Sequence, residues 1–375
     1  MKNVLIVYHY IAHYRIPIFN LLSKSNNPKY TILSGVKTDI NIKTADEHLS
    51  QILPEVGGIK WLKTENYWVF KYFLFQSSVL RHSYSKQYNT IIYLGNMYYL
   101  STWIGAILAR LTNKKVIFWT HGFIREEKNF QGFVRSLFYR LADEILVYGQ
   151  RAKDILISKG FSEHKVAVVY NSLDYDEQLK IRSEVYSEKQ LEIFKDNELP
   201  VFGFIGRLTK QKRIDLLVDV LYKINEANNK ANLLLIGDGE QMDFLKKKVK
   251  ELNLDNFVVF YGACYDEKII CQLMQLMNVV VSPGEVGLNA IHSLCYGVPV
   301  ITHNRFDKQM PEYQAIVENK TGAFFEYEEP IGSLQVVLKD WLFNKNKKQT
   351  REDCFKMIDE YYNPYAQNKI FDSIV

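Results

Sequence analysis

The sequence contains little cysteine, and none of it in a pattern that binds metal. The four cysteines are Cys264, Cys271, Cys295 and Cys354. They form neither a CxxC motif nor a Cys/His spacing, and they stand in apolar or helical surroundings, which argues against a disulfide framework and against a zinc site. We expect these side chains to serve in packing.

Long hydrophobic runs are also missing. No run of about 18 uncharged apolar residues, the length needed to span a bilayer, occurs in the chain. The first residues, MKNVLIVYHYIAHYR, begin a strand pattern at once and lack the small-residue cleavage site of a signal peptide. We therefore expect a cytoplasmic protein that does not cross the membrane. Its 375 residues suffice for two domains.

Acidic residues are scarce in the first half. Residues 1–175 contain 22 Lys and Arg against 12 Asp and Glu, whereas the remainder contains 25 against 30. The net charge of +5 thus divides into a basic first half and an acidic second half. This polarity can steer an anionic partner or an anionic membrane surface toward the first half, and solvated surface charge is the plain alternative.

Apolar strand runs alternate with helical patterns through both halves. In the first half the runs are 4–10, 30–35, 90–95, 116–122, 144–149 and 166–172. In the second half they are 201–206, 233–239, 257–262, 279–283, 299–303 and 321–326, followed by helical stretches at 332–343 and 350–361. This alternation predicts parallel sheets covered on both faces, and hence an α/β protein of two doubly wound, Rossmann-like domains.

The expected boundaries follow from the same rhythm. The first domain covers 1–175, and a charged, helix-prone linker covers 176–199. The second domain covers 200–355, and a helical tail at 356–375 is expected to pack back on the first. Ligand edges that faced one another would form a cleft between the domains, from which water can be excluded.

The stretch 279–303 predicts an anion-binding turn. Val279–Val281 is a β-branched run suited to a buried strand, and Gly284 and Gly287 break the chain after it. A helix at about 288–296 then begins just past a tight turn, so its free N–H groups point over the carboxyl ends of the strands. The alternative is an ordinary β-α unit whose glycines only make turns.

Two cations follow the first strand of the second domain. Arg207 lies just past that strand, and Lys212 opens a helical pattern five residues later. A guanidinium and an ammonium near a helix N-terminus suit a diphosphate, which spreads its charge over several oxygens. A solvated basic face that includes Lys210 and Arg213 is the alternative. The turn and the two cations together favour the diphosphate site.

The order of these motifs resembles that of GT-B glycosyltransferases of the family 4 kind. The motifs are GRL-x3-K (206–212), LLLIGDG (233–239), FYG (260–262), YGVPV (296–300), PE (311–312) and TG (321–322), preceded by HYRIPIF (13–19), THG (120–122) and YNS (170–172). They span nearly the whole chain. The resemblance implies two Rossmann-like domains facing across a cleft, C-terminal helices that cross back to the first domain, a UDP- or GDP-linked sugar donor, retention of the anomeric configuration, and no metal or other cofactor.

The resemblance assigns most donor contacts to the second domain. Arg207 and Lys212 match the pair that binds the donor diphosphate, where negative charge develops as the glycosidic bond breaks. Gly287 and Leu288 match the turn whose backbone amides complete the cradle. The remaining expected donor-binding residues are Gly206, Gly237, Tyr261, Gly262, Gly284, Glu285, Val286 and His292.

The sequence departs from the family at two of these positions. Many members place two glutamates eight residues apart, the first at the donor sugar and the second at the ribose hydroxyls, and here the aligned residues are Gly284 and His292. Glu285, one residue late, is expected to reach the donor sugar after a small loop shift, and helix capping is its alternative role. His292 remains able to hydrogen-bond a ribose hydroxyl.

His121 matches the family histidine that faces the donor sugar from the first domain. A histidine at the carboxyl end of a buried strand can hydrogen-bond a sugar hydroxyl or an oxocarbenium-like centre, and a histidine satisfied by backbone is the alternative. The expected catalytic residues are His121, Arg207, Lys212 and Glu285. The expected acceptor-binding residues are His13, Arg15 and Glu312, of which Glu312 has the plain alternative of a helix-first-turn acid.

Residues 60–86 mix Lys and Arg with Trp, Tyr and Phe. This composition fits the headgroup level of a membrane, and a buried amphipathic helix with core aromatics is the alternative. Family acceptors are often lipid-linked sugars, so a glycan acceptor carried by a lipid and loose attachment to the inner leaflet are expected. No nucleic-acid partner is expected.

The leading hypothesis is thus a retaining hexosyltransferase of surface polysaccharide or oligosaccharide synthesis. One alternative is a sugar-nucleotide epimerase or hydrolase of the same fold, which would need further carboxylates near the sugar, where only Glu285 and Glu312 are candidates. Another is a non-catalytic sugar-nucleotide-binding subunit, as the missing glutamate pair suggests. The presence of Arg207, Lys212 and His121 speaks against that alternative.

Overall fold

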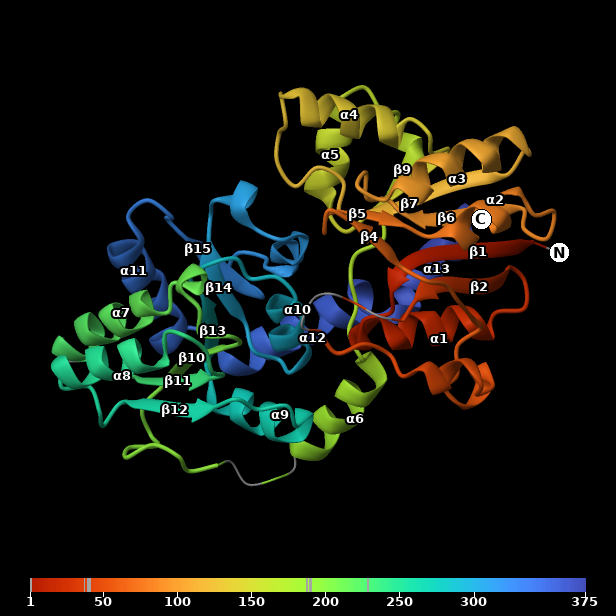
Figure 1. The fold of residues 1–375 in the computed structure, drawn as a ribbon. Coiled ribbons are helices and arrows are strands. Elements are labelled where there is room, and N and C mark those ends of the chain that lie inside the picture. The colour runs from red at the N-terminus through yellow and green to blue at the C-terminus, as the bar shows by residue number, and fades with distance from the viewer. Residues whose placement is uncertain (1, 37, 39–41, 187, 189–190, 228) are drawn as a thin grey trace. The chain divides into compact units, whose positions relative to one another are not determined.

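The computed structural model describes every residue of the chain except 1, 37, 39–41, 187, 189–190 and 228. It divides into two compact units (Figure 1), one made of residues 1–174 and 362–375, the other of residues 175–361. Each unit is built on one parallel sheet with helices packed against it. Within the described residues, no helix combines the length and the apolar sequence that crossing a bilayer requires.

The first unit contains a seven-stranded sheet in the order β3-β2-β1-β6-β7-β8-β9. Its strands are β1 (Asn3–Tyr10), β2 (Lys29–Gly35), β3 (Trp61–Lys63), β6 (Thr90–Leu94), β7 (Lys115–Thr120), β8 (Glu144–Val147) and β9 (Val166–Val168), and β4 (Tyr67–Val69) and β5 (Phe73–Phe75) form a separate hairpin. Its helices are α1 (Ile16–Lys24), α2 (Ser77–Tyr84), α3 (Leu100–Leu111), α4 (Phe130–Tyr139), α5 (Gln150–Ser158) and α13 (Pro364–Ile374).

Both faces of this sheet are buried. Along β1, Val4 and Ile6 enter one hydrophobic core, whereas Leu5 and Val7 enter the other. Side chains alternate across a strand, so a strand that is covered on both sides must be apolar throughout, as β1 is. Helix α13 packs on α1, and Phe371 meets the Trp119 ring edge-on at 5.0 Å between centroids.

The second unit contains a six-stranded sheet in the order β12-β11-β10-β13-β14-β15. Its strands are β10 (Val201–Ile205), β11 (Asn232–Ile236), β12 (Val258–Gly262), β13 (Val279–Ser282), β14 (Val300–His303) and β15 (Gly322–Phe325). Its helices are α6 (Tyr175–Val185), α7 (Asp215–Glu226), α8 (Met242–Glu251), α9 (Glu267–Leu276), α10 (Asn289–Cys295), α11 (Pro330–Phe343) and α12 (Lys347–Tyr361).

The strand order of each sheet reverses at a central strand, which fixes where a ligand would bind. The reversal lies between β1 and β6 in the first unit and between β10 and β13 in the second. Open α/β sheets bind ligands at the carboxyl ends of the strands on either side of such a switch point. The segments that follow β1, β6, β10 and β13 are therefore the first to examine for function, and β7, the neighbour of β6, ends at the same edge.

The α/β prediction is confirmed, since each of the twelve expected strand runs contains a strand. The expected linker, 176–199, begins with α6, which packs on α9 and α10 within the second unit. The alternative of one buried amphipathic helix over residues 60–86 is wrong, because this stretch forms β3, the β4–β5 hairpin and α2. Its aromatic-rich part favours strands, and several of its rings are exposed.

Candidate active site

The expected diphosphate cations lie at the carboxyl ends of β10 and β13. Arg207 follows β10 and is exposed, whereas Lys212 ends a short 3-10 turn and is half-buried. The Lys212 ammonium donates a hydrogen bond to the Glu285 backbone carbonyl, with Nζ and O 2.8 Å apart, and lies 3.6 Å from Glu285 Oε1. Burial lowers the pKa of Lys212, Glu285 opposes that effect, and Arg207 adds to it.

Gly284 allows the turn after β13 to approach Lys212 this closely. The Gly284 N–H donates to the Lys212 carbonyl at 3.2 Å. A Cβ at position 284 would lie 2.4 Å from the Gln211 carbonyl oxygen and 3.0 Å from the Lys212 Cα. No acidic side chain fits at this position without moving the backbone, so Glu285, exposed beside Lys212, is the carboxylate that this turn presents.

A buried glutamine, Gln309, holds the rest of the turn in place. The Val286 N–H donates to Gln309 Oε1 at 2.9 Å, so this amide already has a partner inside the protein. Gly287 has φ of 54°, and nothing lies within 4 Å of a Cβ built there, so the chain is open at that residue. Helix α10, which begins at Asn289, has only seven residues. Because its dipole is correspondingly weak, Arg207 and Lys212 supply most of the local positive charge.

Glycines form the floor of the site at the ends of β10, β11 and β12. A Cβ on Gly237 would lie 1.9 Å from the Gly206 carbonyl oxygen, and the Gly237 N–H donates to the Gly262 carbonyl at 2.8 Å. These three backbones therefore pack directly on one another. Tyr261, the residue before Gly262, is partly exposed beside them. The geometry gives the glycines a shaping role and leaves Tyr261 accessible to a ligand.

His292 is held by a carboxylate that the sequence motifs do not include. Its Nε2 lies 3.0 Å from Glu267 Oε2, and the Tyr296 hydroxyl donates to the same oxygen at 2.7 Å. Burial and the Glu267 carboxylate raise the pKa of Tyr296. Glu267 begins α9, just after the strand that ends at Gly262. The structure thus pairs the His292 imidazole with the Glu267 carboxylate, whereas the sequence motifs predicted only His292 here.

The first unit places a second group of expected residues at the end of its own sheet. Arg15 is buried, donates to the Tyr148 hydroxyl at 2.8 Å, and lies 4.9 Å from the centroid of the Trp119 ring. The His121 ring stacks obliquely on Tyr148 at 4.7 Å between centroids. Surrounding protein and then the Arg15 guanidinium lower the pKa of His121 to about 4, although the residue keeps more than a third of its surface exposed. His121 is therefore neutral at pH 7.

A second neutral histidine lies at the same edge. Burial and Arg15 lower the pKa of His9 to about 3, and His9 Nδ1 is buried without a hydrogen-bond partner. His13 is exposed on the turn before α1. Glu312 lies in the second unit, in the turn Pro311–Ala315, where its side chain is buried. Of the expected acceptor residues, Arg15 is thus directed to Tyr148, His13 faces solvent, and Glu312 is enclosed.

Four residues of these two sites carry no sequence signal or only a weak one: His9, Tyr148, Glu267 and Gln309. Tyr148 directly follows β8, so its place at a strand end was a signal that the expected motifs did not use. Glu267 and Gln309 lie outside the recognised motifs, and only the folded chain brings them to the site. Within the described residues, no group of three or more His, Cys, Asp and Glu side chains is arranged to hold a metal ion.

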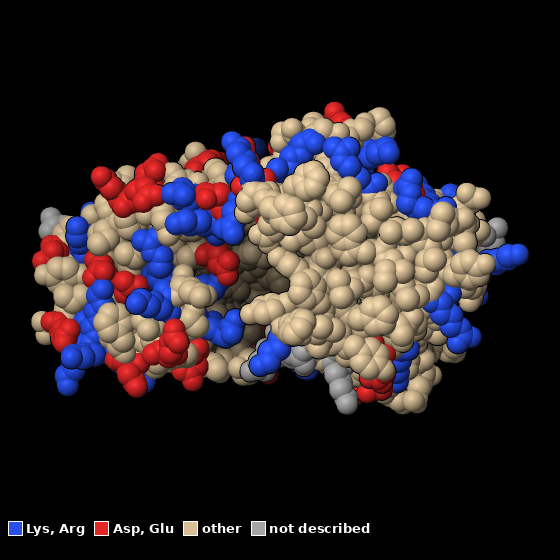
Figure 2. All heavy atoms as spheres, turned by 45° about the horizontal axis from the view of Figure 1, so that its top comes forward, with Lys and Arg blue, Asp and Glu red and all other residues tan. Residues whose placement is uncertain are grey.

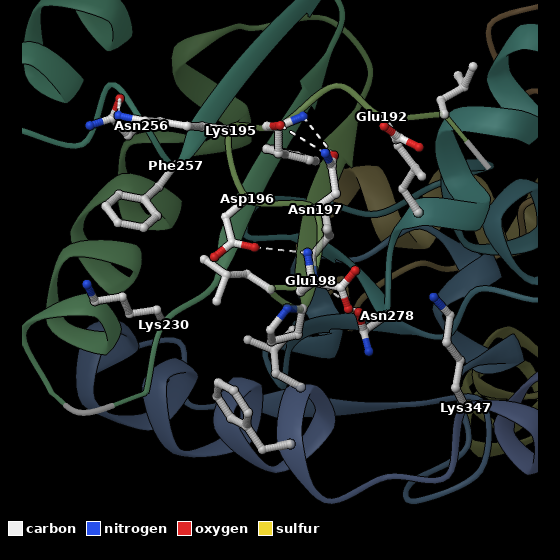
Figure 3. A pocket seen from close by; sticks show the side chains of 18 residues that line it. Glu192, Lys195, Asp196, Asn197, Glu198, Lys230, Asn256, Phe257, Asn278 and Lys347 are labelled. Carbon is white, nitrogen blue, oxygen red and sulfur yellow. Dashed lines mark hydrogen bonds between the residues drawn. The ribbon is translucent and has the colours of Figure 1, made fainter.

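A large open pocket lies at the opposite edge of the second sheet. It has a volume of about 1100 Å³ and is lined by residues at the amino ends of strands, among them Val201, Phe257 and Asn278 (Figure 3). The loop over it bonds to itself, since Asn197 Oδ1 accepts from the Phe194 N–H and Asp196 Oδ1 accepts from the Glu198 N–H. Ligands of such sheets bind at the carboxyl ends, so this pocket is not the candidate site.

The two parallel-sheet units, with their site residues at the carboxyl ends of the strands, define a protein of the GT-B fold class. A family model described as Glycosyl transferases group 1 matches residues 187–354, and one described as Glycosyltransferase Family 4 matches residues 52–177. Together they cover most of the chain. The chain therefore belongs to the family 4-like, group 1 glycosyltransferases, and the resemblance noted in the sequence is confirmed.

Individual relatives match the chain over different lengths. An uncharacterized glycosyltransferase of Methanocaldococcus jannaschii is 35% identical over 126 residues, which are 33% of this chain and 30% of the relative. An uncharacterized 41.2 kDa protein in the cps region of Klebsiella pneumoniae is 28% identical over 258 residues, 65% of this chain and 67% of the relative. The chain thus spans about a third of the first relative and two thirds of the second.

Several solved structures match along the whole chain. The lipopolysaccharide outer core galactosyltransferase WaaB has a TM-score of 0.70 at 16% identity, with 100% of this chain and 99% of that chain covered. Anabaena HepE in complex with UDP has a TM-score of 0.67 at 15% identity, with the same coverage. At these identities the likeness establishes the fold alone.

Proposed function

We propose that the chain is a retaining, metal-independent glycosyltransferase that moves a sugar from a UDP- or GDP-linked donor to a glycan acceptor. The observation that supports this best is the convergence of Arg207, Lys212 and the 284–288 turn at the switch point of a family 4-like chain. The acceptor is proposed to be lipid-linked, in surface polysaccharide or oligosaccharide synthesis. HepE, whose structure contains UDP, makes UDP-sugars the first donors to test.

Lys212 is proposed to bind the departing phosphate. An ammonium has three N–H donors, and one of them is used by the Glu285 carbonyl, so donors remain for phosphate oxygens. Partial burial strengthens the attraction between this charge and a developing phosphate anion, because fewer waters screen it. Arg207, exposed nearby, would add a planar pair of donors. Both cations stabilise the transition state more than the intact donor.

The neutral His121 suits the sugar side of the reaction. Loss of the nucleotide leaves positive character on the sugar ring, and a protonated imidazole nearby would repel it. With a pKa of about 4, His121 stays uncharged at neutral pH and can exchange hydrogen bonds with a sugar hydroxyl. Glu285, exposed beside Lys212, is proposed to contact the donor sugar, and the His292–Glu267 pair is proposed to bind the ribose hydroxyls.

Product analysis with a panel of UDP- and GDP-sugars tests this proposal. The purified chain, incubated with donor and a lipid-linked or soluble oligosaccharide, should release nucleotide in proportion to a lengthened acceptor, with the new linkage in the donor's anomeric configuration. Release of free sugar without acceptor extension would identify a hydrolase. Conversion of the nucleotide sugar to its epimer would identify an epimerase, and either result would replace the proposal.

A further inference from the structure

Large apolar side chains are exposed together on three elements of the first unit. They are Val69, Phe70 and Tyr72 of the β4–β5 hairpin, Leu100, Ile104, Ile107 and Leu111 of α3, and Phe130, Phe133 and Leu137 of α4, which we call the apolar face. The elements adjoin one another, because Leu74 of β5 bridges to Tyr99 and the Trp103 ring of α3 lies 4.8 Å from that of Phe138 in α4. Such a patch exceeds the scattered apolar residues of an ordinary surface.

Helix α3 is amphipathic in the reverse of the usual sense. Its buried side is made of Ser101, Thr102, Gly105, Ala106 and Ala109, all small residues. Four of its large apolar residues stand outward, at positions 100, 104, 107 and 111, with the spacing of one helical face, whereas Trp103 is half-buried against the core. In α4, Phe130 is 79% exposed and Phe133 is 65% exposed. A sequence that places its large apolar side chains outward on two adjoining helices is suited to an apolar partner.

The hairpin tip keeps two side chains in an unfavourable backbone conformation. Phe70 and Lys71 have φ of 51° and 61°, and the Tyr72 N–H donates to the Val69 carbonyl at 3.2 Å, as in a two-residue β-turn. Such turns favour Asn-Gly, because side chains other than Asn and Asp resist positive φ. Here the turn instead presents a Phe that is 82% exposed, next to a Lys.

The charge around the apolar face is mostly positive. Residues 62–140 contain eleven Lys and Arg against three Asp and Glu. Two of the three acids are already paired, Glu126 with Lys128 and Glu127 with Arg135. Figure 2 shows a broad surface of the first unit without charged side chains, with mostly Lys and Arg and a few Asp and Glu along its margin. Apolar and aromatic side chains rimmed by basic ones match the interfacial layer of an anionic bilayer.

We infer that the apolar face docks on an anionic lipid bilayer, with the Phe70–Lys71 tip and the outer faces of α3 and α4 at the level of the headgroups. The hairpin and α3, rather than the whole of residues 60–86, then make the membrane contact. The docking surface includes none of the candidate site residues, and only its consequence for a lipid-linked acceptor rests on the proposed function.

The placement of the face explains how such an acceptor reaches the first sheet. Helix α3 follows β6, and α4 follows the loop that begins at His121, so both helices start at the carboxyl edge of the sheet. The Tyr99 ring lies 5.9 Å from His9 and 6.2 Å from Trp68 of the hairpin. The docked bilayer therefore adjoins the edge that contains His9 and His121, and a lipid-linked glycan can reach it without leaving the membrane.

Vesicle flotation of the full chain tests the docking. Phosphatidylcholine vesicles with about 30% phosphatidylglycerol should carry the protein, and pure phosphatidylcholine vesicles should carry much less, since each basic residue near the surface adds about fivefold in affinity. The variant F130S/F133S should lower the partition coefficient by about tenfold or more. The matched control is Val336→Ser, a 71% exposed residue of α11 in the second unit, which should bind as the wild type does.

A turn-restoring variant removes misfolding as an explanation. Replacing Phe70 by Asn and Lys71 by Gly installs the residues that the turn prefers, so thermal stability should hold or rise while vesicle binding falls by about tenfold. Absence of wild-type binding to anionic vesicles, or equal binding by all variants, would overturn the inference. So would a concentration-dependent dimer in sedimentation that F130S/F133S dissolves, because a second copy would then cover the face.

An activity measurement separates this inference from the proposed function. With a soluble oligosaccharide acceptor, F130S/F133S should turn over as fast as the wild type, and with an acceptor embedded in anionic vesicles it should be slower. Vesicle binding by a chain with no transferase activity would sustain the docking and contradict the proposed function. Equal loss on both acceptors would overturn the docking role and assign these residues to the fold or the site.

Discussion

The carboxyl edges of the two sheets differ in chemistry although their architecture is the same. The second unit presents Arg207 and Lys212 over a floor of glycine backbone, so it offers charge and close approach. The first unit presents the neutral histidines His9 and His121 around a buried Arg15, next to exposed apolar helices. An anionic leaving group suits the former edge, and an uncharged sugar on an apolar carrier suits the latter. The carboxyl edges of two similar sheets therefore suit different parts of the proposed reaction.

Removing the Lys212 ammonium should have the largest effect on activity. Lys212→Ala is expected to lower kcat by about 10²–10³-fold, the usual cost of losing one preorganised donor to a developing anion. Lys210→Ala is the matched control, since Lys210 is an exposed lysine of the same turn and should turn over normally. Steady-state kinetics with a saturating donor measures both, and circular dichroism verifies the fold. Equal kcat for the two variants would remove Lys212 from the mechanism.

A side chain at position 284 should disturb the same sheet edge, because the backbone is closely packed there. Gly284→Ala places a methyl group 2.4 Å from the Gln211 carbonyl oxygen, so we expect a loss of about 1–3 kcal/mol in the free energy of unfolding and a higher KM for the donor. Gly332→Ala is the control, because nothing lies within 4 Å of its Cβ and it stands inside α11. That change should be neutral or stabilising in urea unfolding. Unchanged stability of Gly284→Ala would contradict the close packing.

Neutralising Glu267 tests whether the second unit also binds the ribose of the donor. Glu267→Gln weakens the bonds to His292 and Tyr296, so KM for the nucleotide sugar should rise by about fivefold while kcat changes little. Glu188→Gln, which weakens an exposed ion pair with Lys268 and the hydrogen bond from Gln272, is the control. A fall in kcat without a change in KM would place Glu267 in the chemical step instead.

The smallest expected effect is on the pH dependence of stability. The pKa of His9 lies at about 3 and that of His121 at about 4, both below the unfolded value of 6.5. Between about pH 4 and pH 6.5 the unfolded chain binds more protons than the folded chain. The contribution of the two neutral histidines to the free energy of unfolding is therefore complete above about pH 6.5 and falls as the pH drops toward 4. Replacing His9 by Asn should make urea-unfolding curves less dependent on pH in this window. An unchanged slope would mean that His9 is not held neutral by the fold.

The sequence predicted the sheets well because buried parallel strands must be apolar throughout. Val4–Tyr10 and Val279–Val281 are recognisable on that ground alone. The β4–β5 hairpin was missed because three-residue strands in an aromatic-rich segment leave no clear period. The outward face of α3 was missed for a related reason, since helical periodicity locates an apolar stripe without saying which side the sheet covers.

The site was predictable where motif spacing fixes the backbone, and not where distant segments meet. Arg207, Lys212 and Gly284 follow strands that the pattern defines; Lys212 contacts Gly284 in the structure, and the charge of Arg207 lowers the pKa of Lys212. Glu267 and Gln309 reach the site from other segments, which motif spacing does not place. The aligned position of the first family glutamate illustrates the limit, because only the 2.4 Å approach to Gln211 explains why Gly284 stands there.

Calorimetric titration with UDP and with GDP tests the central claim most directly, that the second unit binds a diphosphate through Lys212 and its neighbouring turn. The wild type and Lys210→Ala should bind one of the two nucleotides with the same affinity, and Lys212→Ala should bind it at least about tenfold more weakly. Equal affinity of all three proteins for that nucleotide would contradict the account.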